Sequence, residues 1–182
     1  MAQAKSNFQS IRVADWMSDG VLAVETFDSI AVARHLMAKH RVNQLPVLDD
    51  DRLIGIVTDR DIRDAYPTSM MINHTKAIDE FAEKITVEEV MTRDIFIVQP
   101  ETPLVQAVSL LRKHRIGSLP VVKNQQLVGI ITRSDILDFV LSGDGRRKRP
   151  AQKRRGAAAK AKKKNQNHSR RGAKAQRSGK TK

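Results

Sequence analysis

The sequence has no cysteine, few aromatic residues and no long apolar run. The absence of cysteine among its 182 residues excludes disulfide bonds, thiolate nucleophiles and cysteine-ligated zinc. No stretch approaches the ~20 apolar residues of a membrane-spanning helix, and residues 1–8 have no apolar run of signal-peptide length. We therefore expect a cytoplasmic protein without a membrane span.

Acidic residues are absent from the last part of the chain. From Arg146 to Lys182 there are 17 Lys and Arg side chains and no Asp or Glu. Taking these 17 from the 33 basic residues of the chain leaves 16 in residues 1–145, against all 20 acidic residues. The formal net charge of +13 thus combines −4 on residues 1–145 with +17 on the rest.

Residues 143–182 also lack large apolar side chains. Burial therefore cannot offset the entropy lost on ordering, and we expect a disordered tail. Its charge is typical of segments that bind DNA or RNA phosphates electrostatically, without sequence preference. An anionic membrane surface is the rival partner, disfavoured because the tail has no apolar anchor. The candidate phosphate-binding residues are Arg146, Arg147, Lys148, Arg149, Lys153, Arg154, Arg155, Lys162, Lys163, Lys164, Arg170 and Arg171.

An internal repeat organises the rest of the chain. Shifting the sequence by 74 residues aligns Val13–Asp64 with Val87–Asp138 without a gap. Two copies are too few for a solenoid, so we predict two similar units packed on each other. Identical pairs include Met17 and Met91, Val24 and Val98, Ala33 and Ala107, Pro46 and Pro120, Gly55 and Gly129, Thr58 and Thr132, and Asp61 and Asp135.

Three apolar runs in each copy predict three strands. Polar tetrapeptides separate the second run from the third, which is the spacing of a hairpin. The first runs are Val21–Val24 and Ile95–Val98, the second are Leu45–Leu48 and Leu119–Val122, and the third are Leu53–Val57 and Leu127–Ile131.

A helix is predicted between the first and second strands of each copy. Asp28 and Thr102 are the expected N-caps, and Pro103 follows at the first helical position. A second helix after the third strand makes each copy a β-α-β-β-α unit. Apolar residues spaced i, i+3 and i+7 give each first helix one buried stripe, formed by Ile30, Ala33 and Met37 and by Leu104, Ala107 and Leu111.

The fold class is therefore α+β, with two tandem β-α-β-β-α repeats. One unit of ~50 residues would bury too little surface alone, so we expect the copies to pack sheet to sheet as a pseudo-twofold module. The expected segments are a flexible lead-in 1–9, repeat 10–66, a connector 67–86 with a short helix near Lys76–Lys84, repeat 87–142 and the disordered tail 143–182.

The segments Gly55–Asp61 and Gly129–Asp135 carry the sharpest local signal. Each runs from a strand into Thr-x-x-Asp at the start of a helix, which is typical of a capping box. The same groups suit a ligand, because a hydroxyl and a carboxylate beside free helix N–H groups bind ribose and phosphate, and glycine lets a ligand approach. The spacing alone leaves both interpretations open.

The whole pattern is similar to a known family. Each copy has "LPV" on its second strand and "GI(V/I)T(D/R)(R/S)DI" after its third, and over roughly residues 10–142 the chain resembles the cystathionine-β-synthase (CBS) domain pair, or Bateman module. The resemblance implies two clefts between the sheets that often bind AMP, ADP or ATP. Some members bind S-adenosylmethionine, which we expect less here.

The resemblance also implies roles for particular residues. The family's ribose- and phosphate-binding positions correspond to Thr58, Asp61, Thr132 and Asp135. The positions that flank the adenine correspond to Val21, Leu22, Ile95 and Phe96.

The two implied clefts differ in charge. The residue after the threonine is acidic in the first copy (Asp59) and basic in the second (Arg133), and only the arginine favours a phosphorylated ligand. Several nucleotide-sensing members have basic residues just before "LPV", where this chain has Asn43-Gln44 and Gly117-Ser118. If one cleft binds a phosphorylated ligand, we expect it to be the one with Arg133.

No set of residues indicates catalysis or metal binding. No Ser/His/Asp set or activated nucleophile occurs at repeat-equivalent positions. His35 and His40 are five residues apart, whereas a helical zinc pair is spaced by four. His40 and His114 end the first helices, where a surface role beside the helix dipole competes with phosphate contact.

We therefore expect a non-enzymatic sensor that requires no cofactor and binds an adenine nucleotide, with a tail that binds nucleic acid. Bateman modules commonly pair face to face, which implies a homodimer. The alternative is a ligand-free scaffold, or the regulatory partner of an enzyme or transporter encoded elsewhere.

Overall fold

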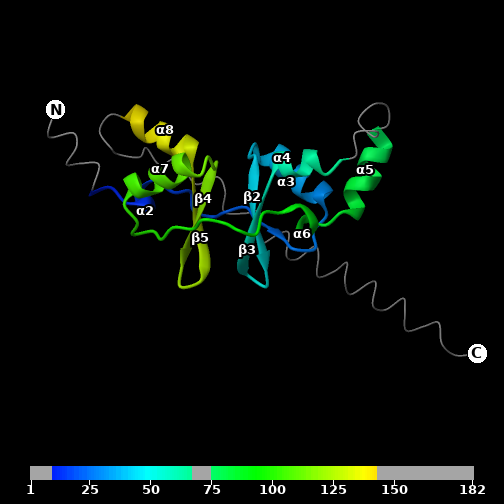
Figure 1. Ribbon diagram of the computed structural model, residues 1–182, viewed down its shortest axis with the longest axis horizontal. Coiled ribbons are helices and arrows are strands. Elements are labelled where there is room, and N and C mark those ends of the chain that lie inside the picture. Colours follow the sequence, from blue (N-terminus) through cyan, green and yellow to red (C-terminus); the bar gives the residue numbers. More distant parts are fainter. Residues whose placement is uncertain (1–9, 67–74, 143–182) are drawn as a thin grey trace, which may run out of the picture. The chain divides into compact units, whose positions relative to one another are not determined.

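The computed structural model describes residues 10–66 and 75–142, which belong to one compact unit (Figure 1). The expected lead-in 1–9 and the basic tail with its candidate phosphate-binding residues lie outside the described residues. Within these two ranges, no helix is long and apolar enough to cross a membrane.

The predicted helices and hairpins occur in the predicted order, but each repeat opens with a short helix that was not predicted, α2 or α6. In the first repeat they are α2 (Val13–Trp16), β1 (Val24–Glu25), α3 (Ile30–His40), β2 (Gln44–Asp49), β3 (Arg52–Thr58) and α4 (Asp59–Asp64). The predicted connecting helix is present as α5 (Thr75–Lys84). In the second repeat they are α6 (Val87–Val90), α7 (Leu104–Lys113), β4 (Ser118–Lys123), β5 (Gln126–Thr132) and α8 (Arg133–Ser142).

The first predicted strand of each copy is wrong in extent. In the first repeat β1 starts only at Val24, which pairs in parallel with Val47 of β2. In the second repeat the equivalent strand is reduced to one parallel bridge between Val98 and Val121. The apolar residues before each bridge have no strand beside them, so apolar character alone does not make them extended ladder residues.

The second and third strands form antiparallel hairpins, as predicted. Each hairpin turns through two residues with positive φ: Asp50 and Asp51 at 46° and 67°, and Asn124 and Gln125 at 51° and 64°. Positive φ at both central residues is the requirement of a type I′ turn, whose twist matches that of the strands. These turns set the register next to each loop, and the register then shifts by one residue between Leu48 and Val47 and between Val122 and Val121.

Helix α3 begins one residue later than the sequence predicts. Ser29 is its N-cap, and the Ser29 hydroxyl accepts a hydrogen bond from the Val32 N–H at 3.3 Å. The carboxylate of Asp28 instead accepts from the Glu25 N–H at 2.9 Å. Asp28 therefore closes the turn before the helix, so its assignment as the cap was wrong.

Helix α7 shows the same shift. Thr102 accepts through its hydroxyl from the Gln99 N–H at 3.0 Å, and Pro103 occupies the N-cap position. The apolar stripes of the two helices are confirmed, because all six residues are buried: Ile30, Ala33, Met37, Leu104, Ala107 and Leu111.

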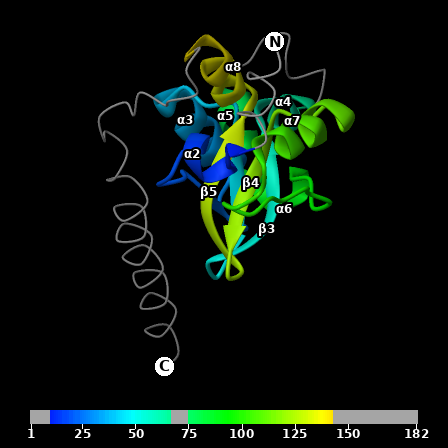
Figure 2. The ribbon, with the colours of Figure 1, turned by 90° about the vertical axis from the view of Figure 1, so that its left-hand side faces the viewer.

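Each core is completed by a segment from the other repeat. Val87 and Met91, which open the second repeat, are buried in the core of the first. Val13 and Trp16, which open the first repeat, are buried in the core of the second. Figures 1 and 2 accordingly show α6 beside β3 and α2 beside β5. We call residues 11–18 and 85–92 the exchanged lead-ins. They are distinct from the expected N-terminal lead-in 1–9.

Backbone and ring contacts attach both exchanged lead-ins. The Val87 N–H donates to the Asp28 carbonyl at 2.8 Å, and the Val13 N–H donates to the equivalent carbonyl of Thr102 at 2.9 Å. Trp16 meets Phe139 of α8 edge to face, with ring centroids 5.1 Å apart. Each hydrophobic core is therefore built from residues of both repeats.

Candidate ligand sites at the ends of the third strands

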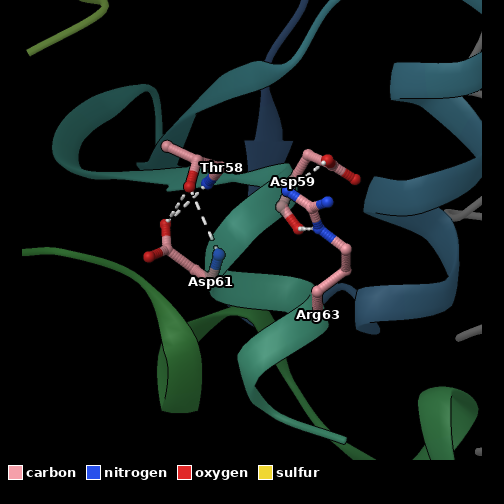
Figure 3. A network of polar contacts seen from close by, with 4 residues as sticks. All are labelled: Thr58, Asp59, Asp61 and Arg63. Atoms are coloured by element: carbon pink, nitrogen blue, oxygen red, sulfur yellow. Dashed lines mark hydrogen bonds and ion pairs between the residues drawn. The ribbon is translucent and has the colours of Figure 1, made fainter. Parts of the chain in front are cut away.

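The Thr-x-x-Asp segment of the first repeat forms a capping box (Figure 3). The Thr58 backbone N–H and hydroxyl donate to Oδ2 of Asp61, at 2.8 and 2.7 Å. The Asp61 N–H donates in turn to the Thr58 hydroxyl at 3.3 Å. The second carboxylate oxygen of Asp61 points away from Thr58 (Figure 3). The capping prediction is thus confirmed. The other carboxylate oxygen of Asp61, Oδ1, takes no part in the capping box.

The second repeat has the same geometry. Oδ2 of Asp135 accepts from the Thr132 N–H at 2.8 Å and from the Thr132 hydroxyl at 2.7 Å. Asp135 is buried, with 8% of its surface exposed. A carboxylate at this depth, at the positive end of α8, is fixed in orientation by its cap. Each cap therefore holds an oriented carboxylate where a strand ends and a helix starts.

The residues beside the caps differ between the repeats. Asp59 forms an ion pair with Arg63 one turn along α4, at 3.0 Å (Figure 3). Arg133 donates from Nε to the Ile116 carbonyl at 2.9 Å. Among the described residues, no carboxylate lies within ion-pair distance of Arg133. The cation beside the second cap is therefore available to an anionic ligand, whereas Asp59 and Arg63 beside the first cap are matched to each other.

The glycines of the two motifs contact protein, which corrects the expectation that they admit a ligand. A Cβ on Gly55 would lie 2.7 Å from Met91 Sδ and 2.9 Å from the Thr92 carbonyl oxygen. A Cβ on Gly129 would lie 2.6 Å from Met17 Sδ. Each glycine therefore makes room for the lead-in of the other repeat, and the identical Met and Gly pairs reflect this packing.

A family model for the CBS domain matches residues 13–68 and 87–142, which contain both capping boxes. The chain belongs to the CBS-domain family. A CBS domain-containing protein of Dictyostelium discoideum is 30% identical over 133 residues, which cover 72% of this chain and 92% of that protein.

Enzymes with a matching region are also among the relatives. The inosine-5'-monophosphate dehydrogenases of Staphylococcus epidermidis and Thermoplasma acidophilum are 39% and 38% identical over 113 and 110 residues. The match covers 60% and 59% of this chain but only 20% and 19% of the dehydrogenases. This chain thus spans about a fifth of their length.

Solved CBS-pair structures share the fold. A putative acetoin utilization protein from Vibrio cholerae is 32% identical, with a TM-score of 0.63 over 72% of this chain and 91% of that one. The CBS domain pair of protein MJ0100, in complex with 5'-methylthioadenosine and S-adenosyl-L-methionine, is 29% identical, with a TM-score of 0.60 over 74% and 98%. CBSX2 in complex with AMP is 28% identical, with a TM-score of 0.60 over 72% and 97%. These relatives show that CBS pairs with this fold bind nucleotides or related nucleosides.

The four residues expected at the adenine lie outside the CBS strands. Val21, Leu22 and Ile95 are half-buried, and Leu22 packs against the first core. Phe96 is partly exposed, and its ring lies 3.9 Å from the His114 ring between centroids. Among the described residues, no hydrogen bond joins these four to either capping box, so their adenine role stays a prediction.

The sequence interpretation missed Ser118, which lies directly opposite Thr132 in the β4–β5 pair. Opposed residues of an antiparallel pair point to the same face, so the two hydroxyls share one face of the sheet. Ser118 is only 3% exposed, and its hydroxyl has no hydrogen-bond partner among the described residues. A buried hydroxyl without a partner is uncommon in folded proteins. The sequence gives only a slight signal for Ser118. Its position was compared with the basic residues that several family members have before "LPV", and a serine there indicates only that the basic residue is absent.

Proposed function

We propose that this protein is a cytoplasmic, non-enzymatic regulator that binds an adenine nucleotide of the AMP, ADP or ATP class through its CBS pair. The observation that carries the proposal is the repeated capping box, which presents an oriented carboxylate at a helix start in both repeats. The ligands named for the MJ0100 and CBSX2 structures all contain an adenosine group. An oriented carboxylate suits the part of adenosine that donates hydrogen bonds, the ribose hydroxyls.

The second repeat is the stronger site. Ribose hydroxyls would donate to Asp135, and a phosphate would accept from Arg133 and from the N–H groups at the start of α8. Ser118 supplies a further hydroxyl on the Thr132 face of the sheet. In the first repeat Asp59 repels phosphate, and Arg63 is already paired with it. Arg133 is the one cation assigned to the second site, and this favours AMP over ATP, because each added phosphate needs further neutralisation.

Titration calorimetry with AMP, ADP, ATP and S-adenosylmethionine tests the proposal. We expect Asp135→Asn to weaken AMP binding by about 10- to 100-fold, the loss of one or two charge-assisted hydrogen bonds. The matched variant Asp61→Asn makes the same change in the equivalent cap of the first repeat. It should change AMP affinity little. Absence of binding by all four compounds would refute the ligand-binding role, whereas a larger effect of Asp61→Asn would reverse the assignment of the sites.

Ser118→Ala separates ligand contact from folding. Removing an unpartnered buried hydroxyl should leave the free protein equally stable or slightly more stable. If Ser118 bonds the ligand, the same variant should lower AMP affinity. Unchanged AMP affinity would remove Ser118 from the site without affecting the rest of the proposal.

We propose further that the tail binds DNA or RNA through its phosphates. If 6–8 of the tail charges contact phosphate, affinity should fall with a log–log salt slope of roughly −5 to −7. Both core clusters lie before Ser142, so a chain ending at Ser142 keeps its buried contacts. Gel shift of this shorter chain should show no retention of DNA, and equal retention by both chains would refute the assignment.

A second candidate is a regulatory partner of another protein, with empty CBS sites. The dehydrogenase relatives favour it, because there the matched region is one part of a larger enzyme. A chain that binds no nucleotide in calorimetry but co-purifies stoichiometrically with an enzyme or transporter would support this candidate over the sensor.

A further inference from the structure

Each third strand lies at the edge of its sheet. The strand order is β1-β2-β3 in the first repeat, and of the described strands β5 pairs with β4 alone in the second. A strand at a sheet edge has one row of backbone N–H and C=O groups that no strand of its own sheet bonds. In both repeats a residue of the other repeat bonds this outer row, shortly before the capping box.

Ser18 bonds the outer edge of β5. Its N–H donates to the Ile130 carbonyl at 2.9 Å, and its carbonyl accepts from the Ile130 N–H at 3.0 Å. Met17, directly before it, packs on Gly129, where an added Cβ would lie 2.6 Å from Met17 Sδ. Ile130 precedes Thr132 by two residues. The first repeat therefore holds β5 two residues before the cap of the second.

Strand β4 bonds the inner edge of β5 up to the cap. Ser118 lies opposite Thr132 in this pair, and the Arg133 N–H donates to the Gly117 carbonyl at 3.1 Å. Two-stranded ribbons twist more than wider sheets, so β4 alone leaves β5 more freedom than bonds on both edges do. The Thr132 N–H and hydroxyl orient the buried Asp135 carboxylate, and their own direction depends on both edges of β5.

We propose that Ser18 of the first repeat is a positioning residue for the ligand site of the second repeat. Its backbone bonds to Ile130 hold the end of β5, and the end of β5 orients Asp135 toward the ribose of a bound nucleotide. This inference rests on the proposed nucleotide site at Asp135. Thr92 has the same place for the first repeat, because it exchanges backbone bonds of 2.9 and 3.0 Å with Ile56. The site of each repeat is thus controlled from the other.

Two matched proline variants test this role. Proline has no N–H, so Ser18→Pro removes the donor to β5, and Thr92→Pro removes the equivalent donor to β3. The residue before a proline favours an extended backbone. Met17 (φ −62°, ψ 153°) and Met91 (φ −68°, ψ 154°) already have one. The two variants therefore lose the same kind of bond and differ in which capping box they affect.

Titration calorimetry of the full chain with AMP compares the variants. We expect Ser18→Pro to weaken AMP binding by about tenfold, the effect of one weakened hydrogen bond to a charged group. Thr92→Pro should change AMP affinity little. If Ser18→Pro does not fold, Gly129→Ala and Gly55→Ala replace the pair. AMP affinity should then fall more in Gly129→Ala, although Gly55→Ala has the closer backbone contact and should be the less stable variant. Opposite orders of affinity and stability exclude a general loss of stability as the cause.

Amide hydrogen exchange gives a readout that a purely structural contact would not change. If Ser18 positions the site, AMP bound there stabilises the bonds of Ser18 in return, by linkage. AMP should therefore slow exchange of the Ser18 amide more than exchange of the Thr92 amide, which reports any general stabilisation by the ligand. Without ligand, the Thr132 amide, which donates to Asp135, should exchange faster in Ser18→Pro than in Thr92→Pro.

Three results would overturn the proposal and leave the proposed function intact. The first is an equal loss of AMP affinity in Ser18→Pro and Thr92→Pro. The second is equal slowing of the Ser18 and Thr92 amides by AMP. The third is equal exchange of the Thr132 amide in the two proline variants. Absence of AMP binding by wild type would instead refute the proposed function, and exchange at Thr132 would still decide whether Ser18 orients the cap.

Discussion

Replacing Gly55 by alanine tests the exchange of lead-ins directly. The new Cβ would lie 2.7 Å from Met91 Sδ and 2.9 Å from the carbonyl oxygen of Thr92. The methionine side chain can rotate away, but the carbonyl cannot move freely. Thr92 exchanges two backbone hydrogen bonds with Ile56, at 2.9 and 3.0 Å, and shifting the carbonyl lengthens both.

The expected loss of stability follows from these contacts. Overpacking of a well-packed site costs about 1–3 kcal/mol. Weakening two backbone hydrogen bonds adds about 1 kcal/mol. The lower chain entropy of unfolded alanine returns about 0.4–1 kcal/mol. We therefore expect Gly55→Ala to lower the free energy of unfolding by about 2–3 kcal/mol.

Two matched variants sharpen the test. At Gly129 the nearest backbone atom, the Ser18 carbonyl oxygen, is 3.1 Å from the new Cβ, so a shift of a few tenths of an ångström suffices. Gly129→Ala should therefore cost about 1 kcal/mol less than Gly55→Ala. At Gly117 the new Cβ would meet only the end of the Gln44 side chain, at 3.1 Å, and the substitution should be close to neutral.

Urea unfolding followed by circular dichroism measures all three variants, with the slope checked for two-state behaviour. The predicted order of stability is Gly117→Ala, then Gly129→Ala, then Gly55→Ala. If Gly55→Ala were as stable as wild type, the lead-in of the second repeat would not pack on this glycine in solution. Adding Met91→Ala to Gly55→Ala should not restore stability, because the carbonyl contact remains and a buried methionine side chain is lost from the first core.

Three further substitutions test other contacts. Gln125→Gly should raise the free energy of unfolding by about 1 kcal/mol, because glycine relieves the positive φ of a type I′ turn; a lower melting temperature would contradict the turn geometry. Trp16→Ala should lower the free energy of unfolding by about 3–5 kcal/mol, and the fluorescence of this sole tryptophan should respond to Leu104→Ala in the second core. The backbone N–H and hydroxyl of Thr86 lower the pKa of Glu89. This carboxylate therefore stabilises the fold above the ordinary glutamate pKa and loses that contribution as pH falls through the lowered pKa. The melting temperatures of wild type and Glu89→Gln should differ at neutral pH and converge in acid.

Features governed by neighbouring residues could be predicted from the sequence. The hairpins follow from apolar runs four residues apart, and the capping boxes follow from Thr-x-x-Asp, because both depend on contacts a few residues away. The N-caps were placed one residue early because Asp28 and Ser29 are equally good caps by type. Only the competing N–H of Glu25, which Asp28 binds, decides between them.

Features that depend on distant contacts could not be predicted in the same way. The apolar residues predict the first strands, but a strand forms only where a neighbouring strand lies close enough for backbone hydrogen bonds. Gly55 and Gly129 were assigned to a ligand because nothing local identifies Met91 and Met17 as their neighbours. The information was present only as identical pairs at a spacing of 74 residues, and an identity does not say which copy contacts which.

The exchange of lead-ins also bears on the candidate sites. Ser18 bonds Ile130 of β5, two residues before Thr132. Thr92 bonds Ile56 of β3, two residues before the other threonine. Each capping box therefore lies at the end of a strand that is held by backbone hydrogen bonds from the exchanged lead-in of the other repeat. A repeat separated from its partner would lack both this attachment and part of its core, so the CBS pair is the smallest unit that can present either site with this geometry.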